Sequence, residues 1–360
     1  MRWCLVFYLL TGFVNITSWA SPDVEDDLIA SQRWREEHSP KIVRILAIDG
    51  GGMRGLIPAR LLQEVEAQTG KSILDHFDFF AGTSTGSLIS LGLTIPKERS
   101  IQPRYSAADI VDIYHTYGKE IFARPLSESV LNPYSVRGPK YSPDNLKKIL
   151  GTYFGETPLS SALKPVLVTS YDMKTATRIT FTSHDAAVCD EYDFPMRKVA
   201  RASSAAPAFF PPSHMKMKNR ETRILTDGCI WALNPAEAAY RSARKLFPDS
   251  EIQVVSLGTG ARDTTLSHKV AKGMGALGWA AQLSFHTIMA QMDLVDQHLK
   301  ESLPGRSGVP GYLRLNVGLD PGQGEMDDTS DRNLAYLEAK ALEITESKDF
   351  GILLKMLEVS

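Results

Sequence analysis

The residue of this chain best suited to chemistry is Ser84, which stands in the sequence GTSTG after a strand-like Phe79–Ala81. Small residues on both sides of a serine let a strand turn sharply into a helix, so the hydroxyl stands beside backbone N–H groups. The pattern therefore predicts an acyl-transfer nucleophile, although short Gly and Ser motifs also form plain tight turns. The other residues of this nucleophile elbow are Gly82, Thr83, Thr85 and Gly86.

A glycine-rich loop precedes the serine in the chain. The apolar run Ile42–Ile48 ends in Asp49-Gly-Gly-Gly-Met-Arg-Gly55, and a helical pattern follows. A glycine turn that feeds a helix N-terminus presents unpaired N–H groups, which suits a phosphate, a dinucleotide or a transient oxyanion. Because no second strand carries an acid at the spacing a dinucleotide site needs and no Walker lysine follows, we favour an oxyanion hole. Its expected residues are Gly50, Gly51, Gly52, Met53, Arg54 and Gly55.

A catalytic serine needs a partner that takes its proton, usually a histidine oriented by a carboxylate. Asp227 follows a strand-like Ile224–Thr226 and precedes glycine, so we expect it at a strand end. If Asp227 contacts Ser84 directly, the two form a dyad, and partial burial raises the proton affinity of the carboxylate. A triad with a later histidine stays open, because the order Ser, Asp, His is that of α/β-hydrolases. The candidate histidines are His268, His286 and His298, each in a helix-like or loop stretch.

The three elements together resemble the patatin-like phospholipases, which carry a D-G-G-G-x-R-G loop, a G-x-S-x-G elbow and a distant D-G-(G or A). The likeness extends from Val43 to Tyr240, and Asp227, Gly228 and Cys229 form the third motif, with cysteine where the family usually has glycine or alanine. It implies a three-layer sandwich with a mostly parallel central sheet and a helical C-terminal extension. It also implies lipid acyl hydrolysis by a Ser84–Asp227 dyad on a phospholipid membrane, with Asp227 as proton acceptor and no metal or other cofactor.

The G-T-S-T-G form of the elbow and the helical extension after Gly260 resemble a narrower group, the bacterial phospholipase effectors of cyclic-oligonucleotide antiphage defence. This resemblance implies a cytoplasmic enzyme that acts on the inner membrane and forms homo-oligomers on activation. Its activator would be a cyclic dinucleotide, cyclic GMP-AMP in the best-known branch. No residue of the sequence by itself indicates a nucleotide site.

The composition of the chain and the order of its apolar runs limit the fold classes that it can adopt. With 360 residues, 43% hydrophobic content and a net charge of -2, the chain can bury one large core and has no bias toward nucleic-acid polymers or disorder. Strand-like and helix-like runs alternate, which predicts an α/β sheet with helices on both faces. We expect a catalytic domain over 43–240 and a mostly helical continuation over 241–360. In the latter, Leu283, Ile288, Met292 and Leu299 lie near helical spacing, and we expect them to pack into the core.

The first 22 residues carry a conflicting signal. Arg2, the apolar run Leu5–Leu10 and the small-residue site Ser18–Ala20 resemble a secretory signal peptide, which would export the enzyme. A start codon assigned too far upstream is the competing explanation, and it fits the cytoplasmic resemblance. The remaining alternatives are a secreted esterase with a Ser-His-Asp triad and a nucleotide-binding module without hydrolase activity.

Overall fold

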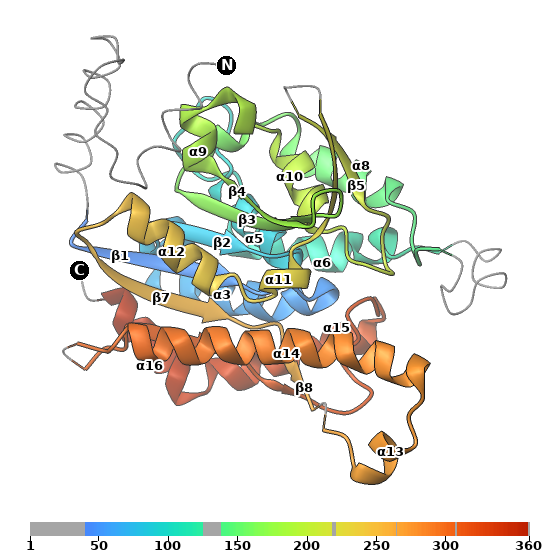
Figure 1. The fold of residues 1–360 in the computed structure, drawn as a ribbon. Helices are drawn as coiled ribbons and strands as arrows, with labels where there is room; N and C mark the ends of the chain where they lie inside the picture. The colour runs from blue at the N-terminus through green and yellow to red at the C-terminus, as the bar shows by residue number, and fades with distance from the viewer. Residues whose placement is uncertain (1–39, 125–137, 218–220, 264, 307, 359–360) are drawn as a thin grey trace, which may run out of the picture.

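The computed structural model describes residues 40–124, 138–217, 221–263, 265–306 and 308–358. The signal-like segment 1–22 lies outside these ranges. An eight-stranded sheet crosses the molecule in the order β5-β6-β3-β2-β1-β7-β9, and β4 also pairs with β3 (Figure 1). The strands are β1 (Ile42–Ile48), β2 (Phe79–Gly82), β3 (Val166–Asp172), β4 (Thr177–Thr182), β5 (Ser213–Lys216), β6 (Thr222–Asp227), β7 (Glu251–Leu257) and β9 (Tyr312–Leu315). A separate pair is formed by β8 (Ala261–Arg262) and β10 (Gly318–Leu319).

The centre of the sheet is parallel and one side is antiparallel. Strands β3, β2, β1, β7 and β9 run parallel to their neighbours, whereas β4, β6 and β5 are antiparallel. The register aligns the last residues of three strands, since Ile48 pairs with both Gly82 and Leu257. The loops that follow β1, β2 and β7 therefore meet at one edge of the sheet, where ligands of open α/β sheets bind.

Helices cover both faces of this sheet, which confirms the predicted three-layer α/β architecture. Alternate residues of β1 pack into the cores on the two faces of the sheet, because successive side chains of a strand point to opposite faces. Leu46 and Ile48 enter the larger core, and Val43, Ile45 and Ala47 enter the smaller one.

Among the described helices of eight or more residues, seven contribute to the larger core. They are α3 (Leu56–Thr69), α5 (Thr85–Thr94), α6 (Ala107–Ile121), α8 (Asp144–Phe154), α10 (Met196–Ser203), α15 (Asp331–Thr345) and α16 (Lys348–Glu358). The smaller core is covered by α12 (Ala236–Leu246) and α14 (Ala276–Ser302), and α11 (Cys229–Ala232) contacts both β3 and α14. Short helices in the connections are η2 (Gly52–Gly55), α4 (Ile73–His76), η3 (Leu159–Ser161), α9 (Ser183–Val188), η4 (Asp190–Tyr192) and α13 (His268–Lys272).

Residues after 240 belong to the same sheet, because they supply β7 and β9. The helical continuation expected over 241–360 contains α13, α14, α15 and α16. The prediction that the apolar residues of α14 pack into the core is correct for Leu299, which is fully buried. It is wrong for Leu283, which is 57% exposed. The reason is geometric: the first part of α14 runs past the body of the molecule together with α13 (Figure 1). Across the described ranges, every helix is either too short or too polar to pass through a lipid bilayer.

Candidate active site

Ser84 lies in the sharp turn between β2 and α5. Its backbone has φ 53° and ψ -121°, an arrangement that costs a residue other than glycine conformational energy. Two glycines make the turn tight. A Cβ on Gly82 would lie 2.2 Å from the carbonyl carbon of Gly86, and one on Gly86 would lie 2.1 Å from the oxygen of Ile48. The chain therefore has the strained strand-to-helix turn that the GTSTG sequence predicts.

Hydrogen bonds from other elements hold this turn in place. The N–H of Ser84 donates to Ser203 Oγ at 2.9 Å, and Ser87 Oγ donates to the carbonyl of Ser84 at 2.6 Å. Thr83 Oγ1 donates to the carbonyl of Ala232 at 2.6 Å. The sequence gave no role to Ser203, since it lies 119 positions away and nothing local marks it as a partner of the elbow.

Asp227 ends β6 and is 1% exposed. Its Oδ1 accepts a hydrogen bond from the N–H of Cys229 at 2.8 Å, and its Oδ2 has no partner with good hydrogen-bond geometry within the described residues. Burial raises the pKa of Asp227 from 3.8 to about 6, and the Ser84 hydroxyl is close enough to lower that pKa by hydrogen bonding. The Ser84 hydroxyl is thus among the groups that act on a buried carboxylate whose pKa is raised to about 6.

The three histidines considered for a triad lie elsewhere. His298 binds Glu237 through Nδ1 at 2.6 Å and Ser302 through Nε2 at 3.0 Å. His268 is exposed on α13, and His286 is half-buried on α14. In the described part of the chain, none of the three lines the pocket around Ser84 or is among the groups that shift the pKa of Asp227.

The glycine loop passes beside the serine. A Cβ on Gly50 would lie 3.2 Å from Ser84 Cβ, so the loop and the elbow are in contact. Three of its N–H groups are used inside the protein: Gly50 donates to Leu233, Met53 to Met326 and Arg54 to Gly51. Among the residues that the structure describes, no acceptor is found for the N–H groups of Gly51 and Gly52. These two are the loop donors left for a developing negative charge.

The close packing of the loop explains two of its glycines. A Cβ on Gly51 would lie 2.4 Å from Thr259 Oγ1. Gly52 has φ +58°, and a Cβ there would lie 2.2 Å from the carbonyl oxygen of Met326. Side chains at either position would displace the loop, so glycine keeps its backbone near Ser84.

Two arginines fix the ends of the loop. Arg314 on β9 donates to both carboxylate oxygens of the buried Asp49, at 2.9 and 2.5 Å. Arg54 Nε donates to the carbonyl of Gly324 at 2.6 Å, and burial followed by repulsion from Arg262 lowers the pKa of Arg54 to about 10. Arg54 therefore remains a cation beside the loop at neutral pH. The sequence motif included Asp49 and Arg54, but it did not indicate Arg314, which comes from the far end of the chain.

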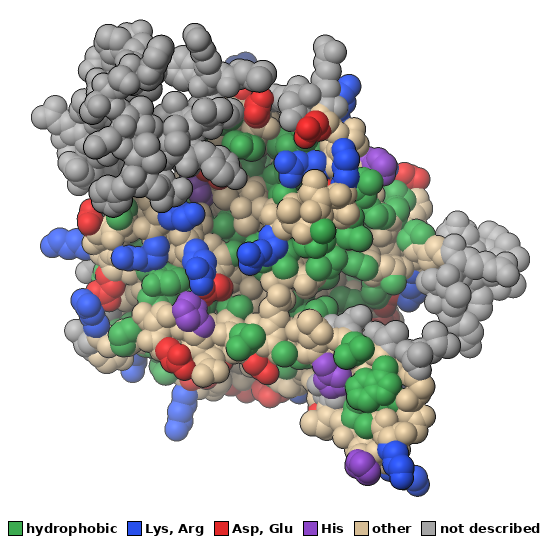
Figure 2. Space-filling model, in the orientation of Figure 1, with side chains coloured by type: hydrophobic (Ala, Val, Ile, Leu, Met, Phe, Trp, Pro, Cys, Tyr) green, Lys and Arg blue, Asp and Glu red, His purple; other side chains and the backbone are tan. Residues whose placement is uncertain are grey.

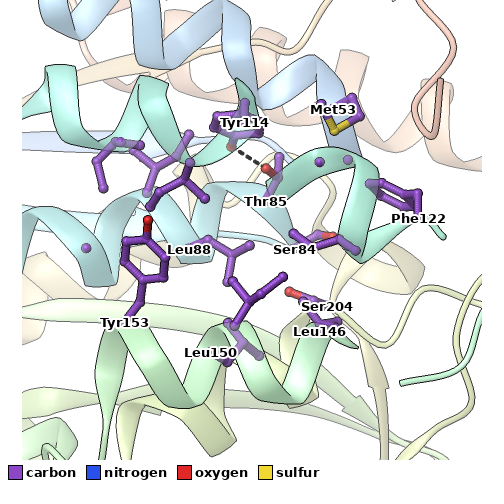
Figure 3. Close-up of a pocket in the computed structure, with 18 of the residues that line it drawn as sticks. Met53, Ser84, Thr85, Leu88, Tyr114, Phe122, Leu146, Leu150, Tyr153 and Ser204 are labelled. Carbon is purple, nitrogen blue, oxygen red and sulfur yellow. Dashed lines mark hydrogen bonds between the residues drawn. The ribbon is translucent and has the colours of Figure 1, made fainter. Parts of the chain in front are cut away.

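An apolar pocket opens next to Ser84 between α5, α6 and α8 (Figure 3). Most of the residues that line it are apolar, as is usual for sites that bind small organic ligands. Leu88, Leu146 and Leu150 face this space close to the serine, and Tyr114 closes it by a hydrogen bond with Thr85 (Figure 3). The sequence reasoning missed α6 and α8 as pocket walls, because their apolar stripes look like those of any core-facing helix.

A strained nucleophile serine at the carboxyl edge of an α/β sheet, beside free N–H groups and an apolar pocket, defines a hydrolase of acyl esters. Comparison with known proteins gives the family. A family model described as patatin-like phospholipase matches residues 46–240. The chain belongs to this family and is an enzyme of the lipid acyl hydrolase class.

Several relatives and solved structures are similar to this chain. Patatin-2-Kuras 1 of Solanum tuberosum is 30% identical over 325 residues, covering 82% of this chain and 84% of the relative. A patatin of the same plant is also 30% identical, with 82% of each chain covered. Among solved structures, VipD from Legionella pneumophila has a TM-score of 0.41 at 11% identity, covering 85% of this chain and 67% of VipD. The type III effector ExoU has a TM-score of 0.36 at 11% identity, covering 89% and 54%.

Proposed function

We propose that this protein cleaves phospholipids of a membrane into a free fatty acid and a lysophospholipid, through an acyl-enzyme on Ser84 with Asp227 as proton acceptor. The observation that carries the proposal is the buried carboxylate of Asp227, whose pKa burial raises to about 6 and the Ser84 hydroxyl lowers in part. A base whose pKa lies near the working pH is both deprotonated and strong enough to take a proton.

The proposed reaction has two halves. Asp227 takes the proton of Ser84 while Oγ attacks the ester carbon, and the N–H groups of Gly51 and Gly52 bind the oxyanion that forms. Collapse of this intermediate breaks the ester C–O bond, and Asp227 passes its proton to the lysophospholipid oxygen. In the second half, Asp227 removes a proton from water, the hydroxide attacks the acyl carbon, and Ser84 recovers its proton as the fatty acid leaves. Each step balances without a metal or another cofactor.

The substrate class follows from the pocket. The described lining is mostly apolar, with Ser84 at one side and no charged side chain, so the pocket suits a hydrocarbon chain better than a charged group. An acyl chain in this space would present its ester carbon to Ser84, while the headgroup would remain outside. The pocket therefore favours a lipid over a short polar ester.

Fatty-acid release from vesicles of phosphatidylethanolamine and phosphatidylglycerol tests the proposal. We expect release by the full chain, with Ser84→Ala and Asp227→Asn each lowering it at least about 1,000-fold. His268→Ala, His286→Ala and His298→Ala serve as matched controls and should retain it. Loss of release in one of the histidine variants would replace the dyad with a triad and support the esterase alternative.

We also propose, on the sequence resemblance alone, that a cyclic dinucleotide such as cyclic GMP-AMP switches the enzyme on in antiviral defence. On this proposal, the protein works in the cytoplasm, associates with the inner membrane and forms homo-oligomers when activated. Fatty-acid release measured with and without cyclic GMP-AMP tests it. Equal release in both conditions would remove the switch and leave the phospholipase, and export of the full chain by cells would favour the secreted form.

A further inference from the structure

Residues 266–283 form a projecting arm, made of α13 and the first turns of α14. Figure 1 shows the arm standing away from the sheet and its covering helices, whereas the rest of α14 lies along the body. The second part of α14 behaves as expected of a covering helix, since Leu299 is fully buried and Val295 packs on the smaller core. The first turns of α14 are therefore more exposed than the rest of the helix, one face of which packs on the body.

The surface of the arm is apolar and basic. Val270, Trp279 and Leu283 are 53%, 41% and 57% exposed, and Figure 2 shows hydrophobic side chains gathered on this projection. Lys269 and Lys272 are exposed on α13, and neither forms an ion pair within the described residues. Between Asp263 and Asp293 the chain contains no acidic residue at all. The last ten residues of α14 differ, since they include Asp293, Asp296 and Glu301.

The base of the arm lies at the same edge of the sheet as Ser84. The loop after β7 contacts the glycine loop, where Thr259 Oγ1 donates to the carbonyl of Gly50 at 2.6 Å. Arg262, in β8 just before the arm, donates to the carbonyl of Gly324 at 3.1 Å, and this carbonyl also accepts from Arg54 of the glycine loop. At the other end, α14 contacts α11, the helix that follows Asp227. The arm is thus attached on both sides to the elements of the catalytic centre.

We propose that this arm is the surface by which the enzyme docks on an anionic lipid layer, which rests on the proposed phospholipase function. Trp, Leu and Val enter the boundary between headgroups and acyl chains, and Lys269 and Lys272 bind anionic headgroups. Absence of acids over this whole stretch removes the repulsion that an anionic surface would otherwise exert. Docking there holds the Ser84 edge of the sheet against the layer that contains its substrate.

Two features separate a lipid layer from a second copy of the chain as the occupant. The exposed residues sit on a narrow projection rather than on a broad face, whereas a stable dimer buries roughly 800 Å² on each partner. The charge is also one-sided, and a symmetric contact between two copies would bring lysines of the same sign together. An anionic surface satisfies both the apolar and the basic side chains of the arm.

Vesicle sedimentation of the full chain in a Ser84→Ala background measures docking without hydrolysis. We expect the double variant Lys269→Glu, Lys272→Glu to bind phosphatidylglycerol-containing vesicles at least about 30-fold more weakly, which corresponds to about 2 kcal/mol. Its binding to phosphatidylcholine vesicles should change little. Leu283→Glu should weaken binding at least about tenfold on both. The matched controls are Lys348→Glu with Lys355→Glu on α16, and Leu342→Glu, whose leucine is 58% exposed. All controls should bind as the parent does.

Activity measurements separate this inference from the proposed function. When the arm variants are made in the enzyme that retains Ser84, they should lose fatty-acid release from vesicles. They should keep the hydrolysis of a soluble short-chain ester, and their melting temperature should not change. Unchanged vesicle binding in the arm variants overturns the docking proposal. The proposal is also overturned if the protein is a dimer that Leu283→Glu converts to monomers while vesicle binding stays the same. Ester hydrolysis that survives Ser84→Ala would instead overturn the proposed function, whereas the binding data would still decide the role of the arm.

Discussion

The pKa of Asp227 leads to a prediction about the pH dependence of turnover. Burial raises this pKa from 3.8 to about 6, and hydrogen bonds from Ser84 and Cys229 oppose the rise. In the proposed reaction, the carboxylate form is active because it must accept a proton. We therefore expect kcat/KM to be level above about pH 6 and to fall about tenfold for each pH unit below it.

Cys229→Ala changes this profile in a defined direction. Burial and the adjacent carboxylate raise the pKa of the Cys229 thiol well above its ordinary value, so the thiol stays protonated and acts as a hydrogen-bond donor to Asp227. Alanine removes this donor but keeps the backbone N–H, which donates to Asp227 at 2.8 Å. The acidic limb should move to higher pH, with activity at high pH unchanged.

The assay is hydrolysis of a soluble short-chain ester from about pH 4 to pH 9, which avoids the titration of lipid headgroups. Cys189→Ala is the matched control, since Cys189 is the other half-buried cysteine of the described residues, and its limb should stay in place. If kcat/KM of the unchanged enzyme falls only near the ordinary pKa of an aspartate, the raised pKa of Asp227 is refuted. A limb that does not move in Cys229→Ala would refute the role of the thiol.

Four further changes have expected outcomes. Asp227→Asn should stabilise the fold by about 3 kcal/mol at pH 8 and leave its stability unchanged below about pH 3.5. The reason is that burial makes the ionised carboxylate of Asp227 unfavourable in the folded state, as its raised pKa shows. Thermal unfolding at both pH values checks this. Gly51→Ala, whose Cβ would lie 2.4 Å from a side-chain oxygen, should lower kcat about 100-fold in steady-state assays while the protein stays folded. Leu150→Trp fills the pocket and should shift preference from long to short acyl esters, and unchanged chain-length selectivity would place the acyl chain elsewhere. Arg314→Leu leaves Asp49 buried and unpaired, so urea unfolding should show a loss of about 3–5 kcal/mol.

The sequence predicts those parts of the site that depend on neighbouring residues. The turn at Ser84 needs small residues on both sides, and the close approaches of Gly82 and Gly86 show why. The position of Asp227 at a strand end also follows from its local pattern. The three-layer architecture was predictable for the same reason, because alternation of strands and helices is visible along the chain.

Features that depend on contacts between distant segments could not be predicted. The partner of Asp49 is Arg314, 265 positions away, and no local signal relates them. Met326 accepts a hydrogen bond from the glycine loop through its backbone carbonyl, a group every residue has. Leu283 fits the apolar stripe of a core helix, but the sheet ends before its part of α14. Spacing along a helix shows which face is apolar, and only the fold shows what covers that face.

Covalent labelling with a fluorophosphonate tests the central claim most directly, because the reagent forms an adduct only with an activated serine. Peptide mass spectrometry of the full chain should place one adduct on Ser84. The adduct should be lost in Asp227→Asn and retained when His268, His286 and His298 are all replaced by alanine. An adduct on Ser84 that survives Asp227→Asn, or that requires one of the histidines, would contradict activation of Ser84 by Asp227.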